Sequence, residues 1–272
     1  MIGYLLVLIL LGIASFIYLK LSIKFKIVDK PNQRSSHTKI TVRGGGIIFT
    51  LAIVLFFLFN NFQYPYFFAG TLIIAIISFL DDLYTLSSKI RFPFQILAVM
   101  LVLFQLDIPI EVLSLLYLFI GLGIINLFNF MDGINGITGL YSMAVLSVFY
   151  FINLHEEIIN PALILYSLIS LVVFGFYNFR KKALFFAGDI GSVTIGILVF
   201  FIALYFAIEL KSPLIILAII VYGADGGNTL LYRKFFTNES IIEAHRHHIY
   251  QKLVDSKRMS HLKVSLIYAA IQ

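Results

Sequence analysis

Long apolar runs separated by short polar stretches recur along the whole sequence and limit what it can fold into. A bilayer core about 30 Å thick is crossed by roughly 20 apolar residues in a helix. The runs fall at Ile2–Leu19, Gly45–Phe59, Tyr66–Leu80, Phe92–Leu106, Ile110–Asn126, Ile137–Leu154, Pro161–Tyr177, Gly191–Ile208 and Pro213–Tyr232, and a tenth begins near Leu262 and is cut off at Gln272. Because they are continuously apolar rather than alternating, they indicate helices and not a β-barrel. We predict an all-α polytopic membrane helix bundle of about ten transmembrane helices, the last one truncated, forming a single domain over residues 1–272.

The composition excludes a water-soluble fold. Hydrophobic residues make up 60% of the chain and charged residues only 12%, whereas a soluble domain is about half apolar and a quarter charged. The chain has no cysteine, so disulfides and thiolate metal ligands are excluded. The first apolar run lacks a basic segment before it and a small-residue cleavage site after it, so we interpret it as a retained span.

The basic residues indicate how the chain is oriented. With nine complete spans, successive loops alternate between the two sides, and 19 of the 20 Lys and Arg residues then fall on one side, the exception being Lys211. The positive-inside rule places that side in the cytoplasm and the N-terminus outside. The net charge of +6 is therefore explained by membrane orientation, and we expect no nucleic acid as a partner.

Acidic residues also gather on the basic side, at the ends of apolar runs. They are Asp81, Asp82, Asp132, Asp189 and Asp225. Carboxylates at this depth are costly unless they are paired, hydrated or bound to a cation. Several of them converging on one face predict a functional site there.

The Asp81-Asp82 pair closes the third run, with Lys89 shortly after it. Adjacent carboxylates repel each other, and a cation or basic partner relieves the repulsion. The alternative is a solvated helix end beside Lys89. The pair alone does not decide between these readings.

Polar residues also close the fifth run. Asn126 and Asn129 are three positions apart and would share a helix face, and Asp132-Gly133 then permits a tight turn close to a ligand. An ordinary inter-helix turn is the alternative. We favour a functional segment because three amides (Asn126, Asn129 and Asn135) and an acid are concentrated in an otherwise apolar region.

Asp189 lies among small residues, Gly188-Asp189-Ile190-Gly191-Ser192, at the start of the eighth run. A helix N-terminus favours anions such as phosphate, and Asp189 is a candidate metal ligand. It could also serve simply as an N-cap.

Two further polar segments lie on the basic side. His245-Arg246-His247-His248 suits phosphate recognition, since Arg binds phosphate in a bidentate manner, and its alternative is a basic patch touching lipid head groups. The first loop ends in Arg43 and three glycines, which allow close approach to phosphate or to another helix.

Together these motifs resemble the polyprenyl-phosphate N-acetylhexosamine-1-phosphate transferase family, in its surface-glycan branch. The matching segments are Asp29 to His37, Asp81-Asp82, Asn126-x-x-Asn129-x-x-Asp132-Gly133, Gly188-Asp189-x-Gly191-Ser192, and the His-Arg-x-His-x-Tyr-Gln run at 245–251. They occur in family order over nearly the whole chain. Asn135 departs from the pattern, because many relatives have a second Asp there.

The resemblance implies a multi-pass enzyme of the bacterial inner membrane with its active site on the cytoplasmic face. The donor would be a UDP-N-acetyl-sugar, the acceptor undecaprenyl or another polyprenyl phosphate, the nucleotide product UMP and the metal Mg²⁺, with Mn²⁺ as an alternative. Such a reaction would begin the assembly of O-antigen or another envelope glycan. The sugar and any homo-oligomer are left open.

The resemblance also implies residue roles. The expected catalytic residues are Asp81, Asp82 and Asp189, and the expected metal ligands are Asp189 and Asp132. The expected substrate-binding residues are His37, Arg43, Lys89, Asn126, Asn129, Asp132, His245, Arg246 and His248. Within this set, the Asn/Asp segment is expected to line the nucleotide site and the histidine loop to hold donor phosphates or sugar.

Three other functions compete with this one. A transferase of phospho-N-acetylmuramoyl-pentapeptide is the nearest enzyme alternative. A transporter would place acids near mid-bilayer in both halves, whereas these acids crowd one face. A lipid-binding scaffold explains the basic loops but not the acidic motifs.

For the transferase itself, the sequence leaves two mechanisms open: direct attack by the lipid phosphate and a covalent aspartyl intermediate.

Overall fold

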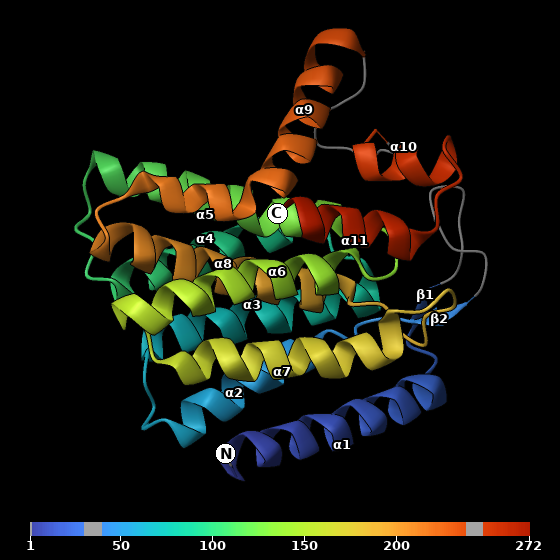
Figure 1. Cartoon of the computed structure of the whole chain (residues 1–272), viewed down its shortest axis with the longest axis horizontal. Helices are drawn as coiled ribbons and strands as arrows, with labels where there is room; N and C mark the ends of the chain where they lie inside the picture. Colours follow the sequence, from blue (N-terminus) through green and yellow to red (C-terminus); the bar gives the residue numbers. More distant parts are fainter. Residues whose placement is uncertain (1, 30–39, 238–246) are drawn as a thin grey trace.

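The computed structural model describes residues 2–29, 40–237 and 247–272, and His37, His245 and Arg246 lie outside them. It is an all-α bundle with one two-stranded antiparallel sheet (Figure 1). In chain order the elements are α1 (Ile2–Phe25), β1 (Val28–Asp29), β2 (Thr41–Val42), α2 (Ile47–Phe59), α3 (Pro65–Tyr84), α4 (Ser88–Gln105), α5 (Val112–Met131), α6 (Ile137–Glu156), α7 (Pro161–Asn178), α8 (Gly188–Glu209), the 3₁₀ helix η1 (Pro213–Ile219), α9 (Ile220–Phe236), α10 (Ile249–Asp255) and α11 (His261–Ile271).

The predicted fold class is confirmed, and the apolar runs coincide with helices. In the described part of the chain, eight helical segments are long and apolar enough to cross a membrane, counting η1 and α9 together. The runs at α2 and α11 form helices of only 13 and 11 residues. The ninth run is not one α-helix, since it begins with 3₁₀ geometry at Pro213. The protein is a multi-pass membrane protein.

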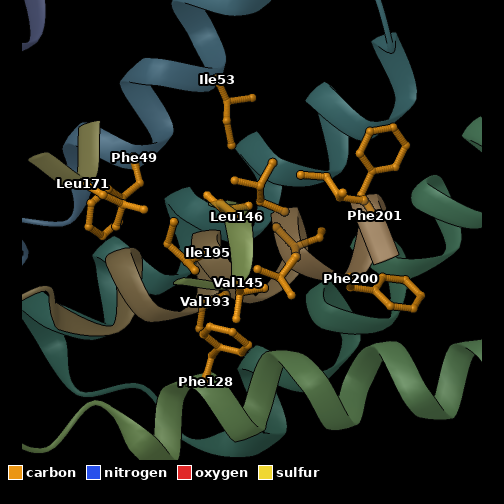
Figure 2. Packing of buried hydrophobic residues seen from close by; sticks show 14 of the residues in the cluster. Phe49, Ile53, Phe128, Val145, Leu146, Leu171, Val193, Ile195, Phe200 and Phe201 are labelled. Carbon is orange, nitrogen blue, oxygen red and sulfur yellow. The ribbon is translucent and has the colours of Figure 1, made fainter. Parts of the chain in front are cut away.

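Helix α8 lies at the centre of the bundle. It packs against α3 and α5, and most of its residues are buried. Figure 2 shows Val193, Ile195, Phe200 and Phe201 of α8 surrounded by side chains of other helices, including Phe128 of α5. A helix that is apolar on all sides belongs in an interior. The central position of α8 fixes its N-terminus, where Asp189 lies.

The first loop is fastened to the start of α8. Strand β1 pairs with β2, and Val42 also bridges to Phe185. The N–H groups of Gly45 and Gly46 then donate to the carbonyls of Phe186 and Ala187 at 2.8 and 2.9 Å. From the sequence, the glycines are expected to allow close approach either to phosphate or to another helix, and these contacts show the approach to a helix.

Gly46→Ala is expected to destabilise the protein by about 1–3 kcal/mol, the usual cost of overpacking. A Cβ at this position would lie 2.2 Å from Cα of Gly191, which is backbone and cannot move aside. Thermal unfolding of the purified protein in detergent measures the loss. The matched control is Gly12→Ala in α1, where a Cβ meets nothing within 4 Å. Equal midpoints for the two variants would contradict the close packing of α2 on α8.

Candidate active site

Three carboxylates from two helices meet at one end of the bundle. Asp81 and Asp82 lie in the last turn of α3, and Asp189 lies in the first turn of α8. The buried Asp82 carboxylate accepts hydrogen bonds from the N–H groups of Asp189 and Ile190 at 2.9 and 3.1 Å. Asp82 therefore satisfies the exposed N–H groups that begin α8. The alternative of Asp189 as a simple N-cap is wrong, because the carboxylate that caps α8 comes from α3.

Two arginines hold these acids together. Arg43 Nε lies 2.6 Å from Asp82 Oδ1, and its NH2 lies 3.3 Å from Asp189 Oδ1. Arg91, near the start of α4, places NH1 2.5 Å from Asp81 Oδ2 and 3.5 Å from Asp189 Oδ2. Asp189 is thus bracketed by two guanidinium groups, each shared with one acid of α3. Such a cluster of guanidinium groups suits an anionic ligand such as phosphate.

The charge on Arg43 is secured by its neighbours. Burial lowers the pKa of the guanidinium, but Asp189 and Asp82 outweigh burial and raise that pKa above its ordinary value. The peptide carbonyl of Arg43 also accepts a hydrogen bond of 2.7 Å from the Tyr18 hydroxyl. Arg43 is consequently a fixed positive charge at the cluster.

Asn129 and Asp132 extend the site along α5. The Asn129 amide donates to Asp189 Oδ1 at 3.0 Å and to Ser192 Oγ at 3.2 Å. Asp132, which follows the last residue of α5, accepts a 2.5 Å hydrogen bond from the Thr138 hydroxyl. Asp132 also interacts electrostatically with Asp189 and Arg43. The acidic residues singled out at the ends of the third, fifth and eighth runs therefore do converge.

Asp132 gives the protein a pH-dependent stability. Burial raises the pKa of its carboxyl to about 7, and the nearby Asp189 adds to that rise. An unfolded chain ionises this group near the ordinary value of about 4, so between pH 4 and 7 it binds fewer protons than the folded protein. Stability is therefore expected to fall as the pH rises through this window and to level off above about 7.

Asp132→Asn removes this titration while keeping an oxygen that accepts from Thr138. The thermal midpoint of the variant minus that of the wild-type protein is expected to be a few degrees larger at pH 8 than at pH 5. The two midpoints are compared in detergent without divalent metal. A constant difference between variant and wild type over that range would contradict the raised pKa.

Two predicted substrate-binding residues lie beside the carboxylates rather than among them. Lys89 is exposed at the start of α4, and Arg91, two residues later, makes the contacts with the acids. Asn126 bonds with Gln95 of α4, its Nδ2 donating to Gln95 Oε1 at 3.1 Å. Substrate roles for Lys89 and Asn126 stay predictions.

The histidine segment is represented by His248, which precedes α10. Its Nδ1 lies 3.2 Å from Asp225 Oδ1 of α9, and its side chain is only 4% exposed. The same aspartate accepts from the N–H groups of Ile249 and Tyr250 at 2.9 and 3.2 Å. Asp225 therefore holds both the start of α10 and the histidine ring.

An apolar groove of about 360 Å³ lies between α5 and the η1–α9 segment. Its walls include Ile120, Ile124 and Leu127 of α5 and Ile216, Ile220 and Leu230 on the facing segment. Its polar lining is Asn126, Thr229 and His248. Asn126 lies one helical turn before Asn129, which contacts Asp189, so the polar part of the groove is close to the carboxylates.

The carboxylates of this site are compatible with a divalent ion that takes only a few of its ligands from the protein. In residues 2–29, 40–237 and 247–272 there is no group of three or more Asp, Glu or His side chains that could hold a metal. Asp81 Oδ2 and Asp189 Oδ2 nevertheless both contact Arg91 NH1, at 2.5 and 3.5 Å. Mg²⁺ commonly binds one or two carboxylates and completes its shell with water and substrate phosphates. Asp189 and Asp81 would supply the carboxylate oxygens for such an ion.

Comparison with known proteins identifies the family. The sequence model of glycosyl transferase family 4 matches residues 64–207, more than half of the chain. The chain belongs to this family. It is similar to a probable undecaprenyl-phosphate N-acetylglucosaminyl 1-phosphate transferase of Bacillus subtilis (strain 168), at 28% identity over 91% of the chain and 76% of the relative. It is also similar to an undecaprenyl-phosphate alpha-N-acetylglucosaminyl 1-phosphate transferase of Yersinia pestis, at 26% identity over 88% of the chain and 72% of the relative.

Family membership confirms the resemblance seen in the sequence and makes the chain an enzyme. The region matched to family 4 runs from the start of α3 almost to the end of α8 and contains the clustered carboxylates. Arg43 and His248 lie outside it. The structure brings Arg43 to the cluster and His248 to the adjoining groove.

Three contributions were missed in the sequence. Arg91 counts in the sequence only as one of the 19 basic residues on one side, although it bridges Asp81 and Asp189. No role is predicted from the sequence for Gln95, and Asp225 is recognised there only as one of the acids at the ends of apolar runs. A sequence signal did exist for Arg91 and Gln95, because both follow the Asp-Asp pair at the start of an apolar run, where polar side chains are unusual.

Proposed function

We propose that the enzyme transfers an N-acetylhexosamine-1-phosphate from a UDP-sugar to undecaprenyl phosphate, or to a similar polyprenyl phosphate, and releases UMP. The observation that carries the proposal is an acid–arginine cluster beside an apolar groove among membrane helices. A phosphate-bearing lipid needs both surfaces at once. The similarity to proteins named undecaprenyl-phosphate N-acetylglucosaminyl 1-phosphate transferases supports the choice of acceptor.

The apolar groove suits the prenyl chain of the acceptor. Its walls are aliphatic side chains and glycines, with polar groups confined to Asn126, Thr229 and His248. A prenyl chain in this groove would place its phosphate at the polar part, beside the carboxylates. The UDP-sugar would then approach from the loop side, where Arg43 and Arg91 are partly exposed.

Charge neutralisation is the main requirement of the reaction, because two phosphate groups must meet. Arg43 and Arg91 supply positive charge, and their partly exposed guanidinium groups can contact substrate phosphates. The lipid phosphate oxygen attacks the β-phosphorus of the donor in line, the bond from that phosphorus to the bridging oxygen breaks, and UMP departs. A phosphate monoester has its second pKa near 6, so Asp81 need only orient the attacking group.

We also propose that Mg²⁺ participates, held by Asp189 and Asp81. A bound divalent ion would screen the donor phosphates and stabilise the departing charge. Asp132, also predicted as a metal ligand, contacts Thr138, and we assign it here to the nucleotide side of the site. Mn²⁺ is expected to replace Mg²⁺, since both prefer oxygen ligands.

The active site is proposed to face the cytoplasm of a bacterial inner membrane. The chain has no cysteine, so single cysteines introduced by mutation report their side without background. Ser87→Cys and Lys182→Cys, both exposed at the end that bears the acids, should label with an impermeant maleimide only after the inner membrane is opened. Asn61→Cys and Asp107→Cys, exposed at the opposite ends of their helices, should label in intact spheroplasts. The reverse pattern would contradict the orientation.

The proposed reaction is tested with purified enzyme, undecaprenyl phosphate and Mg²⁺. A panel of UDP-sugars is supplied, including UDP-N-acetylglucosamine and UDP-N-acetylmuramoyl-pentapeptide, and the lipid product is identified by mass spectrometry. We expect an undecaprenyl diphospho-N-acetylhexosamine. A product formed only from the pentapeptide donor would favour the peptidoglycan alternative, and no lipid product from any donor would refute the proposal.

A further inference from the structure

Asp225 makes an unusual number of contacts for an acid within an apolar helix. Its Oδ1 lies 3.2 Å from His248 Nδ1 and accepts from the Thr229 hydroxyl at 3.3 Å. Its Oδ2 accepts from the Tyr268 hydroxyl at 2.5 Å. Together with the two N–H groups at the start of α10, these contacts join α9, α10 and α11 through one buried carboxylate.

The segment that carries His248 is also fixed from the side of α5. The Tyr250 hydroxyl donates to the carbonyl of Phe130 at 3.2 Å. Gly133 makes this approach possible, since a Cβ there would lie 2.1 Å from the Tyr250 hydroxyl oxygen. The start of α10 is therefore docked beside the end of α5, where Asn129 and Asp132 enter the site.

The position of His248 indicates which substrate it meets. Its ring lies on the wall of the apolar groove together with Asn126 and Thr229. The histidine is thus associated with the surface that suits a lipid.

We propose that Asp225 is a positioning residue that holds His248 toward the phosphate of the polyprenyl acceptor. The assignment rests on the proposed function and changes the expected role of His248, which the resemblance gave to the donor. A carboxylate at Nδ1 fixes the orientation of an imidazole and the nitrogen that carries its proton. With Nδ1 committed to Asp225, the imidazole meets the phosphate through Nε2. When the acceptor phosphate still carries one proton, that proton moves from a phosphate oxygen to Nε2 of His248. Asp225 then stabilises the resulting imidazolium.

The test measures acceptor and donor requirements separately in His248→Gln, Asp225→Asn and the double variant. We expect each single variant to raise the KM for undecaprenyl phosphate about tenfold, the effect of losing one charge-assisted hydrogen bond. The KM for the UDP-sugar is expected to stay within about twofold of the wild-type value, because the substitutions remove no contact that binds the donor. The double variant should be no worse than His248→Gln alone, because Asp225 acts through the histidine.

His247→Gln is the matched control, since this neighbouring ring packs against Tyr232 at 5.6 Å and does not line the groove. Tyr268→Phe removes one contact of Asp225 but keeps the carboxylate, and it should shift the acceptor KM less than Asp225→Asn does. If Asp225→Asn does not fold, His248→Gln and Tyr268→Phe still decide the matter. An increase in the donor KM alone, or additive effects in the double variant, would overturn the proposal.

Binding of undecaprenyl phosphate without any nucleotide provides a readout that does not depend on turnover. Native mass spectrometry of the purified protein is expected to show weaker lipid retention in His248→Gln than in His247→Gln. If the wild-type enzyme retains the lipid and His248→Gln does not, yet no sugar phosphate is transferred, the proposed function fails and the assignment of His248 stands. If transfer occurs and lipid retention is unchanged in His248→Gln, the assignment fails and the proposed function stands.

Discussion

Asp189→Asn is expected to lower the rate of sugar-phosphate transfer by about 100- to 1,000-fold, the range found when a single group that stabilises transition-state charge is lost. The carboxylate of Asp189 is the point shared by Arg43, Arg91 and Asn129. An amide has nearly the same size and still accepts from Asn129, but it carries no charge to hold the arginines or a divalent ion. The loss should therefore appear in kcat and persist at saturating Mg²⁺.

The matched control for this substitution is Asp107→Asn, the same chemical change at an exposed position of the opposite end of the bundle. Both variants are purified in the same detergent, and their thermal unfolding is compared before the assay. The control should keep wild-type activity. If Asp189→Asn were folded and fully active, the carboxylate would not take part in the reaction and the metal assignment would fail with it.

Asp82→Ala is expected to destabilise the folded protein by about 3 kcal/mol, the cost of leaving a buried charge without its partner. Three contacts are lost at once, from Arg43 Nε and from the N–H groups of Asp189 and Ile190. Arg43 keeps its contact with Asp189, so the loss is at the low end of that range. The start of α8 would be released and Asp189 displaced, and activity should fall even in the fraction of protein that stays folded.

Asp82→Asn separates the two parts of this effect. The asparagine oxygen still accepts one of the backbone N–H groups, while the ion pair with Arg43 is lost, so its thermal midpoint should lie between those of the wild-type protein and Asp82→Ala. Thermal unfolding in detergent orders the three proteins. If both variants unfolded with the wild-type midpoint, Asp82 would not cap α8 in the membrane protein.

Much of the fold follows from the sequence because the bilayer imposes a simple rule. A span must be long, apolar and internally hydrogen-bonded, so the apolar runs alone located the helices, and α8 was found within three residues of its start at Gly188. The exceptions have local causes. Pro213 opens the ninth run with a 3₁₀ helix, and α11 contributes only 11 helical residues.

The candidate site was predicted in its residue types but not in its contacts. The Asp-Asp pair and Asp189 stand out because carboxylates are rare next to apolar runs. Which arginine reaches them depends on the turn between α3 and α4, and a change of two positions, from Lys89 to Arg91, replaces an exposed side chain by one that bridges two acids. Sequence spacing also could not show that Asp82 caps α8, since the two are more than one hundred residues apart.

Asp225 illustrates the same limit at longer range. In the sequence it is an acid followed by two glycines in an apolar run, a pattern that is typical of helix packing through small residues. Its partners come from α10 and α11, elements that lie beyond a long polar stretch. Their convergence depends on how α9 and α11 pack together, and no local pattern specifies that packing.

The nucleotide product of the reaction tests the central claim most directly. The purified enzyme is incubated with undecaprenyl phosphate, Mg²⁺ and its preferred UDP-sugar, and the released nucleotide is identified by chromatography. A centre that neutralises two phosphate groups and joins them should release UMP, in an amount equal to the lipid diphosphate formed. Release of UDP would mean that the sugar alone is transferred, and that the acid–arginine cluster does not perform phosphoryl transfer.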